Sequence, residues 1–350
     1  MLGGAAAGRR RGKRIVTTAI EHPSVLEPMR QLEKEGFEVV FLTPDADGRV
    51  PEEAVLKAVT GDTILISVMA VNNELGSIQP IEVLKKAVKR AGAPALVHVD
   101  GVQAYGKLPL RPEKLGIDLL TVSGHKIHGP KGVGALYVSK NARILPRTFG
   151  GGQERELRPG TEAAPLIAGL GAAAEELPDW GQAYSRMEKL RDYTLQKLSG
   201  LEGVEVNSPV GGLPYLLNFS ALGIRSETML HFLAQRGIYV SSGSACAKGK
   251  QSHVLKAAGL PDSRISSAIR VSFPGKHRAG RGRLGGRRAR GPGLPGQSQE
   301  IAADPGLRPA GQPNFLGNPG KPFLGKHRAG HGRPGGGSRF GLAGPAGIRR

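Results

Sequence analysis

Apolar and polar residues alternate in blocks along the first 140 residues, and the blocks have the lengths of strands and helices. Unbroken apolar runs are typical of strands buried on both faces of a sheet. Helical patterns, with acidic residues or proline at their starts, separate several of these runs. The expected strands are 15–18, 38–42, 63–68, 95–99, 119–122 and 133–138, and the expected helices are 23–35, one starting near 51, and 81–91. The pattern predicts an α/β fold, a mostly parallel sheet with helices on both faces.

The pattern changes after the glycines at 150–152. It now predicts fewer, shorter strands and longer helices, which is typical of a smaller α+β domain. The expected helices are 162–176, 180–198 and 226–236, and the expected strands are 204–206, 215–219 and one near 238–240. We therefore expect a basic N-terminal segment at 1–13, a large domain at 14–160 that is incomplete at its N-terminus, and a small domain at 161–273 that includes the connecting helices.

Residues 274–350 differ from everything before them. They contain 21 glycines and 10 prolines, and the hexapeptide Gly275–Gly280 recurs at Gly325–Gly330. Such a segment has too few apolar side chains to offset the entropy of ordering, so we expect a disordered tail. One interpretation is an arm that binds RNA without sequence preference. The other is sequence unrelated to the domain before it, such as a shifted or misjoined reading frame.

The net charge of +20 is concentrated at the two ends of the chain. Residues 1–14 carry +5 and residues 274–350 carry +13, whereas 15–273 carry only +2. The folded part is therefore nearly neutral, which argues against a nucleic-acid-binding core.

Cys246 is the only cysteine, which excludes an intrachain disulfide and fits a reducing compartment. No apolar run approaches the roughly 20 residues of a membrane span, so we expect a cytoplasmic protein without membrane contact.

Candidate chemistry follows the ends of the expected strands. Asn72 and Asn73 follow one strand, Asp100 ends the next, and the sequence Ser-Gly-His-Lys at 123–126 follows a third. Because ligands gather at the carboxyl ends of parallel strands, one cleft can collect these residues. Lys126, among small and imidazole side chains, suits attack on an aldehyde, since burial favours its neutral amine. Pyridoxal phosphate (PLP) is the usual aldehyde, and Asp100 is the candidate acid for its pyridine nitrogen.

Seven motifs in order resemble the cysteine desulfurases, PLP enzymes of the class V aminotransferase group with fold type I. The resemblance covers about residues 14–273. The motifs are Thr-Ala-Ile-Glu-His at 18–22, Val-Asn-Asn-Glu-Leu-Gly at 71–76, His-Val-Asp-Gly-Val-Gln at 98–103, Ser-Gly-His-Lys at 123–126, Arg-Pro-Gly-Thr at 158–161, Ser-Ser-Gly-Ser-Ala-Cys at 241–246 and Ala-Ile-Arg-Val-Ser at 268–272.

The resemblance implies a role for each matching residue. Lys126 would bind PLP covalently and move the substrate proton, Asp100 would pair with the pyridine nitrogen, and His22 would stack on the ring and assist proton transfer. Arg270 would bind the substrate carboxylate in a bidentate manner. Gln103 would hydrogen-bond to the phenolic oxygen of the cofactor, and Asn73 would lie beside the cofactor and the substrate carboxylate. Ser123 and His125 would bind the cofactor phosphate, and Thr161 would reach the phosphate of a neighbouring subunit. Asn72 is interpreted as structural, and no metal is expected.

The resemblance also implies the reaction. L-cysteine would become L-alanine, and Cys246, whose nearby lysines favour the thiolate, would take the sulfur as a persulfide. The enzyme would be a homodimer that passes sulfur to an acceptor, either an iron–sulfur scaffold or a tRNA-thiolation enzyme. Alternatives that remain open are a selenocysteine lyase or an aminotransferase of the same fold, and RNA binding through the tail.

Two departures from the family pattern lead to a further alternative. A Gly-rich turn that cradles the PLP phosphate is expected upstream of His22 and does not occur there, and the tail from residue 274 replaces an expected terminal helix. We therefore also weigh a truncated family fragment that binds PLP poorly and is weakly active, inactive or unstable.

Overall fold

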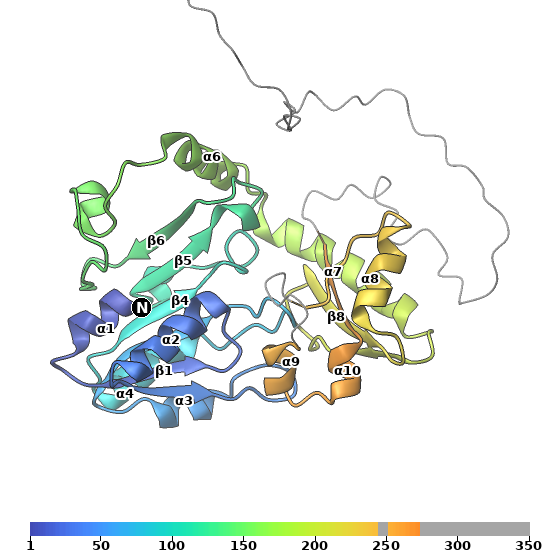
Figure 1. Cartoon of the computed structure of the whole chain (residues 1–350), viewed down its shortest axis with the longest axis horizontal. Helices are drawn as coiled ribbons and strands as arrows, with labels where there is room; N and C mark the ends of the chain where they lie inside the picture. Colours follow the sequence, from blue (N-terminus) through green and yellow to red (C-terminus); the bar gives the residue numbers. More distant parts are fainter. Residues whose placement is uncertain (244–250, 274–350) are drawn as a thin grey trace, which may run out of the picture. The chain divides into compact units, whose positions relative to one another are not determined.

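A six-stranded sheet forms the centre of the first domain in the computed structural model, which describes residues 1–243 and 251–273 (Figure 1). The strand order is β2-β1-β3-β4-β5-β6. The first five strands are parallel, and β6 runs antiparallel to β5. The strands are β1 (Arg14–Thr18), β2 (Glu38–Leu42), β3 (Thr63–Met69), β4 (Leu96–Asp100), β5 (Leu119–Ser123) and β6 (Gly134–Val138).

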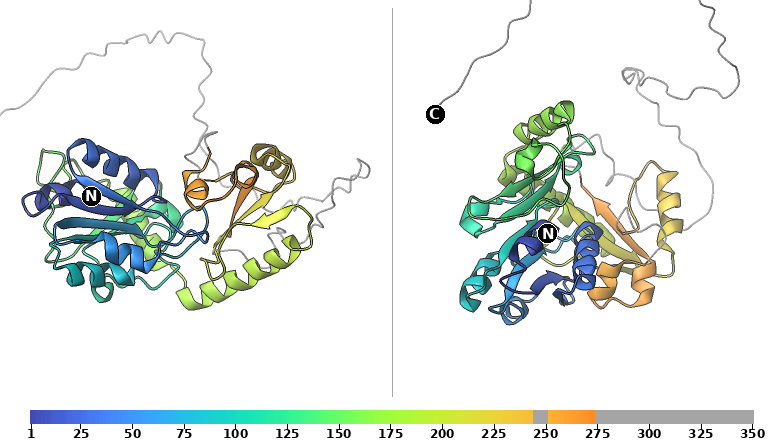
Figure 2. Two further views of the ribbon diagram at one scale, coloured as in Figure 1. Left: turned by 90° about the horizontal axis from the view of Figure 1, so that it is seen from below. Right: turned by 60° about the vertical axis from the view of Figure 1, so that its left-hand side comes forward.

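Helices cover both faces of this sheet, as the two views in Figure 2 show. Adjacent residues of a strand point to opposite faces, so Ile15 packs in one apolar cluster with α1 and α2, and Val16 packs in another with α3 and α4. Two adjacent residues of β4 are divided in the same way: Leu96 packs in the cluster of Ile15, and Val97 packs in the cluster of Val16. The helices of this domain are α1 (Leu2–Gly8), α2 (Pro23–Lys34), α3 (Glu52–Ala58), α4 (Glu82–Ala91) and α5 (Pro112–Leu115).

The second sheet is small and antiparallel, with β8 between β7 and β9. An apolar cluster joins its helices to the segments that follow β1 and β3, because Ile20 and Leu75 pack with Val254 and Leu255. The strands are β7 (Val204–Val206), β8 (Leu216–Ala221) and β9 (Ala268–Ser272), and the helices are α6 (Ala164–Glu175), α7 (Trp180–Leu198), α8 (Ser226–Ala234), α9 (His253–Ala257) and α10 (Asp262–Ser266). Two 3-10 turns complete the described part, η1 (Gly124–Lys126) and η2 (Gln153–Glu156).

The predicted fold class, a mostly parallel sheet plus a smaller α+β unit, is confirmed. The strand expected near 238–240 is wrong. The N–H of Ile238 donates to the carbonyl of Leu233 and finishes α8, and only an isolated bridge follows, between Ser241 and Arg270. In the described part of the chain, no helix combines the length and the apolar character needed to cross a membrane. The tail at 274–350 and Cys246 lie outside the described residues.

Candidate active site at the ends of the parallel strands

Three parallel strands end side by side and bring the predicted polar residues to one edge of the sheet. Met69 at the end of β3 is in register with Asp100 at the end of β4, and Asp100 is in register with Thr121 of β5. The carbonyl of Asp100 also accepts a hydrogen bond from the N–H of Ala70, at 2.9 Å. The turn that carries Lys126 follows β5 directly. Strand register therefore sets the spacing between the acid and the lysine.

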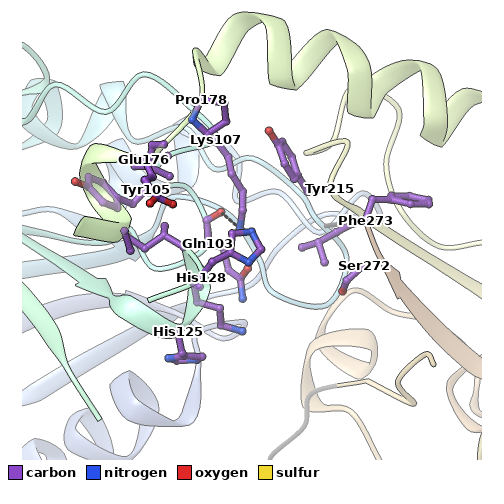
Figure 3. A pocket seen from close by; sticks show the side chains of 16 residues that line it. Gln103, Tyr105, Lys107, His125, His128, Glu176, Pro178, Tyr215, Ser272 and Phe273 are labelled. Atoms are coloured by element: carbon purple, nitrogen blue, oxygen red, sulfur yellow. Dashed lines mark hydrogen bonds between the residues drawn. The ribbon is translucent and has the colours of Figure 1, made fainter. Parts of the chain in front are cut away.

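Lys126 lies in a short loop whose ends belong to one strand pair. The N–H of Gly124 donates to the carbonyl of Val133 at 3.0 Å, and the N–H of Gly129 donates to the carbonyl of Gly124 at 2.9 Å. Lys126 lines a cavity of about 240 Å³ together with Gln103, His125 and residues of the small sheet such as Leu216 and Ser272 (Figure 3). Hydrogen bonds within the loop thus fix the backbone from which the amine extends into the cavity.

Asp100 is a buried carboxylate. Burial raises the pKa of Asp100, whereas the hydrogen bond from the N–H of Val102 and the charges of His22 and Lys126 act in the opposite direction. Among the described residues, that N–H is the only hydrogen-bond donor to its carboxylate. A cation held against the carboxylate would offset the cost of its burial. The protonated nitrogen of a pyridine ring is such a cation, so Asp100 fits PLP.

His22 stands at the start of α2, close enough to Asp100 and Lys126 for electrostatic interaction. Its Nδ1 accepts a hydrogen bond from the N–H of Ser24 at 3.2 Å, so the ring also caps the helix. Burial lowers the pKa of His22, with Asp100 opposing the shift and Lys126 adding to it. The lowered pKa favours the neutral imidazole near pH 7, and the predicted place of the ring beside the cofactor stays a prediction.

Ser123 and His125 pair with each other beside Lys126, with 2.7 Å between Oγ and Nδ1. Burial lowers the pKa of His125, and the charges of Lys126 and Lys131 lower it further. Two neighbouring lysines and two polar side chains make this position favourable for an anion. The arrangement fits the phosphate of PLP.

Arg270 projects from β9 toward the turn after β3. Its Nη1 donates to the carbonyl of Asn73 at 2.9 Å, and its Nη2 donates to Oγ of Ser241 at 3.4 Å. Its Nε is buried and has no hydrogen-bond partner within the described residues. Burial lowers the pKa of Arg270, and Glu74 opposes that shift. A buried guanidinium with an unused donor fits a carboxylate ligand.

Asn72 has a structural role, as its sequence context indicated. Its Oδ1 accepts from the N–H groups of Glu74 and Leu75, both at 2.9 Å, and its Nδ2 donates to the carbonyl of Ile20 at 3.0 Å. These bonds form the turn that presents Asn73, which is 7% exposed.

The cavity in Figure 3 contains only part of the predicted site. Gln103, His125 and Lys126 line it, whereas Asp100 and the other predicted residues of the described part do not. We define the candidate site by the strand ends, because register and hydrogen bonds place Asp100 there. The predicted Thr161 is exposed, and its expected role toward a second subunit stays a prediction.

Two ionisable residues near the site, the buried Glu21 and the half-buried Lys107, were not identified from the sequence. Oε1 of Glu21 accepts from Oγ1 of Thr18 at 2.9 Å and from the N–H of Met69 at 2.7 Å, and its Oε2 is buried without a hydrogen-bond partner in the described part. Burial raises the pKa of Glu21 to about 8, and Asp100 contributes to the rise. The proximity of Glu21 to His22 in the sequence was a signal that could have located it.

Lys107 is the second such residue. Its Nζ donates to the carbonyl of Gln103 at 3.2 Å and lies 5.6 Å from the centre of the Tyr215 ring, in the same cavity as Lys126 (Figure 3). Burial lowers the pKa of Lys107 to about 8, and the charge of Lys126 lowers it further. No motif in the sequence pointed to this lysine.

Glu21 makes the stability of the fold depend on pH. Because the pKa of Glu21 is higher in the folded chain than in the unfolded chain, the contribution of its protonated form to the free energy of unfolding is complete below pH 4.5. That contribution decreases as the pH rises toward about 8. We expect Glu21→Gln, which keeps the shape but cannot ionise, to remove a slope of up to about 1.4 kcal/mol per pH unit. Urea unfolding at pH 5.5 and 7.5 would measure it. The same slope in both proteins would contradict the prediction.

The strand order and the positions of Asp100 and Lys126 after neighbouring strands define a PLP fold type I protein. The sequence matches the aminotransferase class-V family over residues 2–277. The chain belongs to the aminotransferase class-V family, whose members depend on PLP.

Cysteine desulfurases are among its relatives. A cysteine desulfurase of Nostoc sp. is 44% identical over 266 residues, which cover 75% of this chain and 66% of the relative. The solved structure of a NifS-like protein has a TM-score of 0.72 at 41% identity and covers 79% of this chain and 74% of that one. The structure of SspA in complex with cysteine has a TM-score of 0.67 at 34% identity, covering 78% and 77%. The chain thus spans 66% of the length of the first relative.

Proposed function

We propose that this chain is a PLP-dependent cysteine desulfurase. It binds L-cysteine, releases L-alanine and keeps the sulfur on Cys246. The observation that carries the proposal is the cluster of Asp100, His22 and Lys126, three groups that interact electrostatically at the ends of β1, β4 and β5. The similarity to cysteine desulfurases, and to a structure that contains cysteine, supports the choice of substrate.

The cofactor would be held by residues of the six-stranded sheet. Asp100 would accept a hydrogen bond from the pyridine nitrogen, Gln103 would donate to the phenolic oxygen, and Ser123 and His125 would bind the phosphate. When bound, PLP supplies an aldehyde that captures amines and a ring that accepts electrons from the substrate. The amine of Lys126 attaches the cofactor and afterwards takes the proton from Cα of the substrate.

The substrate would be oriented by residues other than those that hold the cofactor. Arg270 would bind the α-carboxylate through its unused donor, and Asn73 would contact the same carboxylate through its side chain. Because Nδ1 of His22 accepts a hydrogen bond from the N–H of Ser24, the proton of the neutral ring lies on Nε2, which would donate a hydrogen bond at the reacting end of the substrate. Two separate sets of residues would therefore fix the amino acid at its carboxylate and at its reacting end.

Sulfur transfer balances without an added oxidant. The thiolate of Cys246 attacks the substrate sulfur, an S–S bond forms, and the bond between that sulfur and Cβ breaks with its electron pair on carbon. Protonation of Cβ gives L-alanine, and the sulfur stays on the protein as a persulfide. Cys246 is the only cysteine of the chain, so no other thiol competes for this role.

The partners follow from the same proposal. Thr161 is exposed, as a residue that reaches the phosphate site of a second subunit must be. A persulfide requires an acceptor, for which an iron–sulfur scaffold and a tRNA-thiolation enzyme are the two candidates. Light scattering of the full-length chain with PLP would test for the dimer.

The decisive experiment supplies L-cysteine to the full chain loaded with PLP and measures L-alanine together with the mass of the Cys246 peptide. We expect one L-alanine per persulfide in the first turnover, because each transfer releases one of each. In Cys246→Ser we expect L-alanine formation to fall by about 10²-fold or more, since the nucleophile is lost.

Three outcomes would contradict the proposal. L-alanine without persulfide, at an unchanged rate in Cys246→Ser, would remove the sulfur-transfer role. A keto acid as product would indicate an aminotransferase, and turnover of selenocysteine alone would indicate a selenocysteine lyase. The control Ser199→Ala changes an exposed residue at the end of α7 and should match the parent protein.

A further inference from the structure

A second cavity, of about 470 Å³, lies at the edge of the six-stranded sheet opposite the candidate active site. It is lined by Leu96, the first residue of β4, whereas Asp100 is the last residue of that strand. β5 also begins at this edge, and the antiparallel β6 ends there. Three basic side chains and one acidic side chain line the cavity, so its wall carries a formal charge of +2. They are Arg11, Lys85, Arg143 and Asp118, and the proposed function uses none of them.

The acidic residue of this cavity is already engaged by the fold. Oδ2 of Asp118 accepts a hydrogen bond from the N–H of Val97 at 2.8 Å and lies 3.6 Å from Nζ of Lys85. Its Oδ1 accepts a hydrogen bond from Oγ of Ser139 at 3.3 Å. These contacts connect β4 and the start of β5 to the segment after β6. The charge of Lys85 offsets that of Asp118, so the excess positive charge belongs to the two arginines.

Arg11 and Arg143 are positioned through the backbone. The N–H of Arg11 donates to the carbonyl of Gly8 at 2.8 Å, in the turn after α1. The N–H of Leu145 donates to the carbonyl of Gly3 at 3.1 Å, which ties the segment of Arg143 to the same helix. Within the part of the chain that the structure describes, neither guanidinium has a hydrogen-bond or ion-pair partner. Both are therefore available to a ligand in the cavity.

Other arginines near Arg11 in the sequence have partners in the fold. The guanidinium of Arg9 lies 5.3 Å from the centre of the Phe37 ring, and Nη2 of Arg14 lies 2.6 Å from a carboxylate oxygen of Glu38. These two side chains stabilise the contact between α1, β1 and the elements beside them. Arg11 instead lines the cavity, so its side chain is not needed to hold the basic segment in place.

We propose that this cavity binds an organic phosphate monoester, with Arg11 and Arg143 on the phosphate and the apolar wall of the cavity against the organic group. A phosphate monoester carries close to two negative charges at pH 7, which matches the charge of the wall. Guanidinium groups bind phosphate oxygens through paired hydrogen bonds. Pro94 and Leu96 supply apolar surface that a bare phosphate ion would leave unused. The inference does not depend on the proposed function.

Chemical labelling of arginine tests the site in the parent protein, with phenyl phosphate as the probe. Phenylglyoxal labels exposed guanidinium groups, and fragmentation of the labelled peptides distinguishes Arg11 from its neighbour Arg10. At ten times the Kd of the probe, about one cavity in eleven stays empty, so labelling of Arg11 and Arg143 should slow about tenfold. Arg10 is exposed and does not line the cavity, so its labelling should stay unchanged. Unless Arg11 and Arg143 are both protected more than Arg10, the inference is overturned.

Calorimetric titration of the full chain with phenyl phosphate measures the contribution of each arginine. Arg11→Gln and Arg143→Gln should each weaken binding about tenfold, as expected for losing a hydrogen bond to a charged group. Arg10→Gln removes the same charge beside the cavity and should bind the probe as the parent protein does. Equal affinities in Arg10→Gln and Arg143→Gln would reduce the effect to general charge and would overturn the site.

Comparison with inorganic phosphate tests the class of ligand. Phenyl phosphate should bind more tightly than inorganic phosphate, because only the ester can use the apolar wall. Equal affinities of the two probes would overturn the assignment to an organic phosphate. All substitutions change exposed residues, so the far-UV circular dichroism of each variant should match that of the parent protein.

Discussion

Lys126→Ala should lose both covalent cofactor attachment and turnover. The amine extends from a loop closed by β5 and β6 and interacts electrostatically with Asp100 and His22, a combination that no other lysine of the described residues shows. We expect activity with L-cysteine to fall by about 10³-fold or more. The measurement is borohydride reduction of the chain with PLP, followed by peptide mapping of the pyridoxyl group.

Lys140→Ala is the matched control, because Lys140 is exposed in the turn that follows β6, at the other end of that strand from the Lys126 loop. It should keep both the pyridoxyl label at Lys126 and the activity. Lys107 is the rival attachment site, because it lines the same cavity and burial lowers its pKa to about 8. A label that maps to Lys107 in the parent protein would contradict the assignment of Lys126.

Asp100→Asn should produce the second large loss. The substitution keeps the size of the side chain and its hydrogen bond from the N–H of Val102, but it removes the charge that would pair with the pyridine nitrogen. Removing one partner of a buried ion pair costs about 3–5 kcal/mol, which corresponds to about 10²–10⁴-fold in cofactor affinity. Fluorescence titration of the variant with PLP would measure the loss.

Asp47→Asn serves as the control, since Asp47 is exposed in the loop after β2. It should bind PLP as the parent protein does. Equal affinity in Asp100→Asn and Asp47→Asn would show that the carboxylate of Asp100 does not contact the cofactor.

The sequence was sufficient for features that depend on local patterns. The unbroken apolar run of β3 predicted a strand buried on both faces, and every residue of Thr63–Met69 is buried. The polar residues after β3, β4 and β5 were expected at one edge, because parallel strands of one sheet end together. Register then brings Met69, Asp100 and Thr121 side by side.

Features that depend on distant or competing contacts could not be predicted. The apolar run at 238–240 resembled a strand, but the N–H of Ile238 is used by the end of α8 and Tyr239 is 83% exposed. The bond between Glu74 and Ser252 joins residues 178 positions apart, which no local pattern can reveal. The raised pKa of Glu21 likewise arises from burial beneath neighbouring elements.

The two sheets divide the proposed tasks between them. Asp100 ends a strand of the larger sheet and Lys126 lies in the turn after the next strand, whereas Arg270 belongs to β9 of the smaller sheet. The larger sheet would therefore set how the vitamin B6 ring is held, and the smaller sheet how the head group of the amino acid is held. Because that head group is the same in every α-amino acid, engineering of side-chain selectivity should begin outside β9.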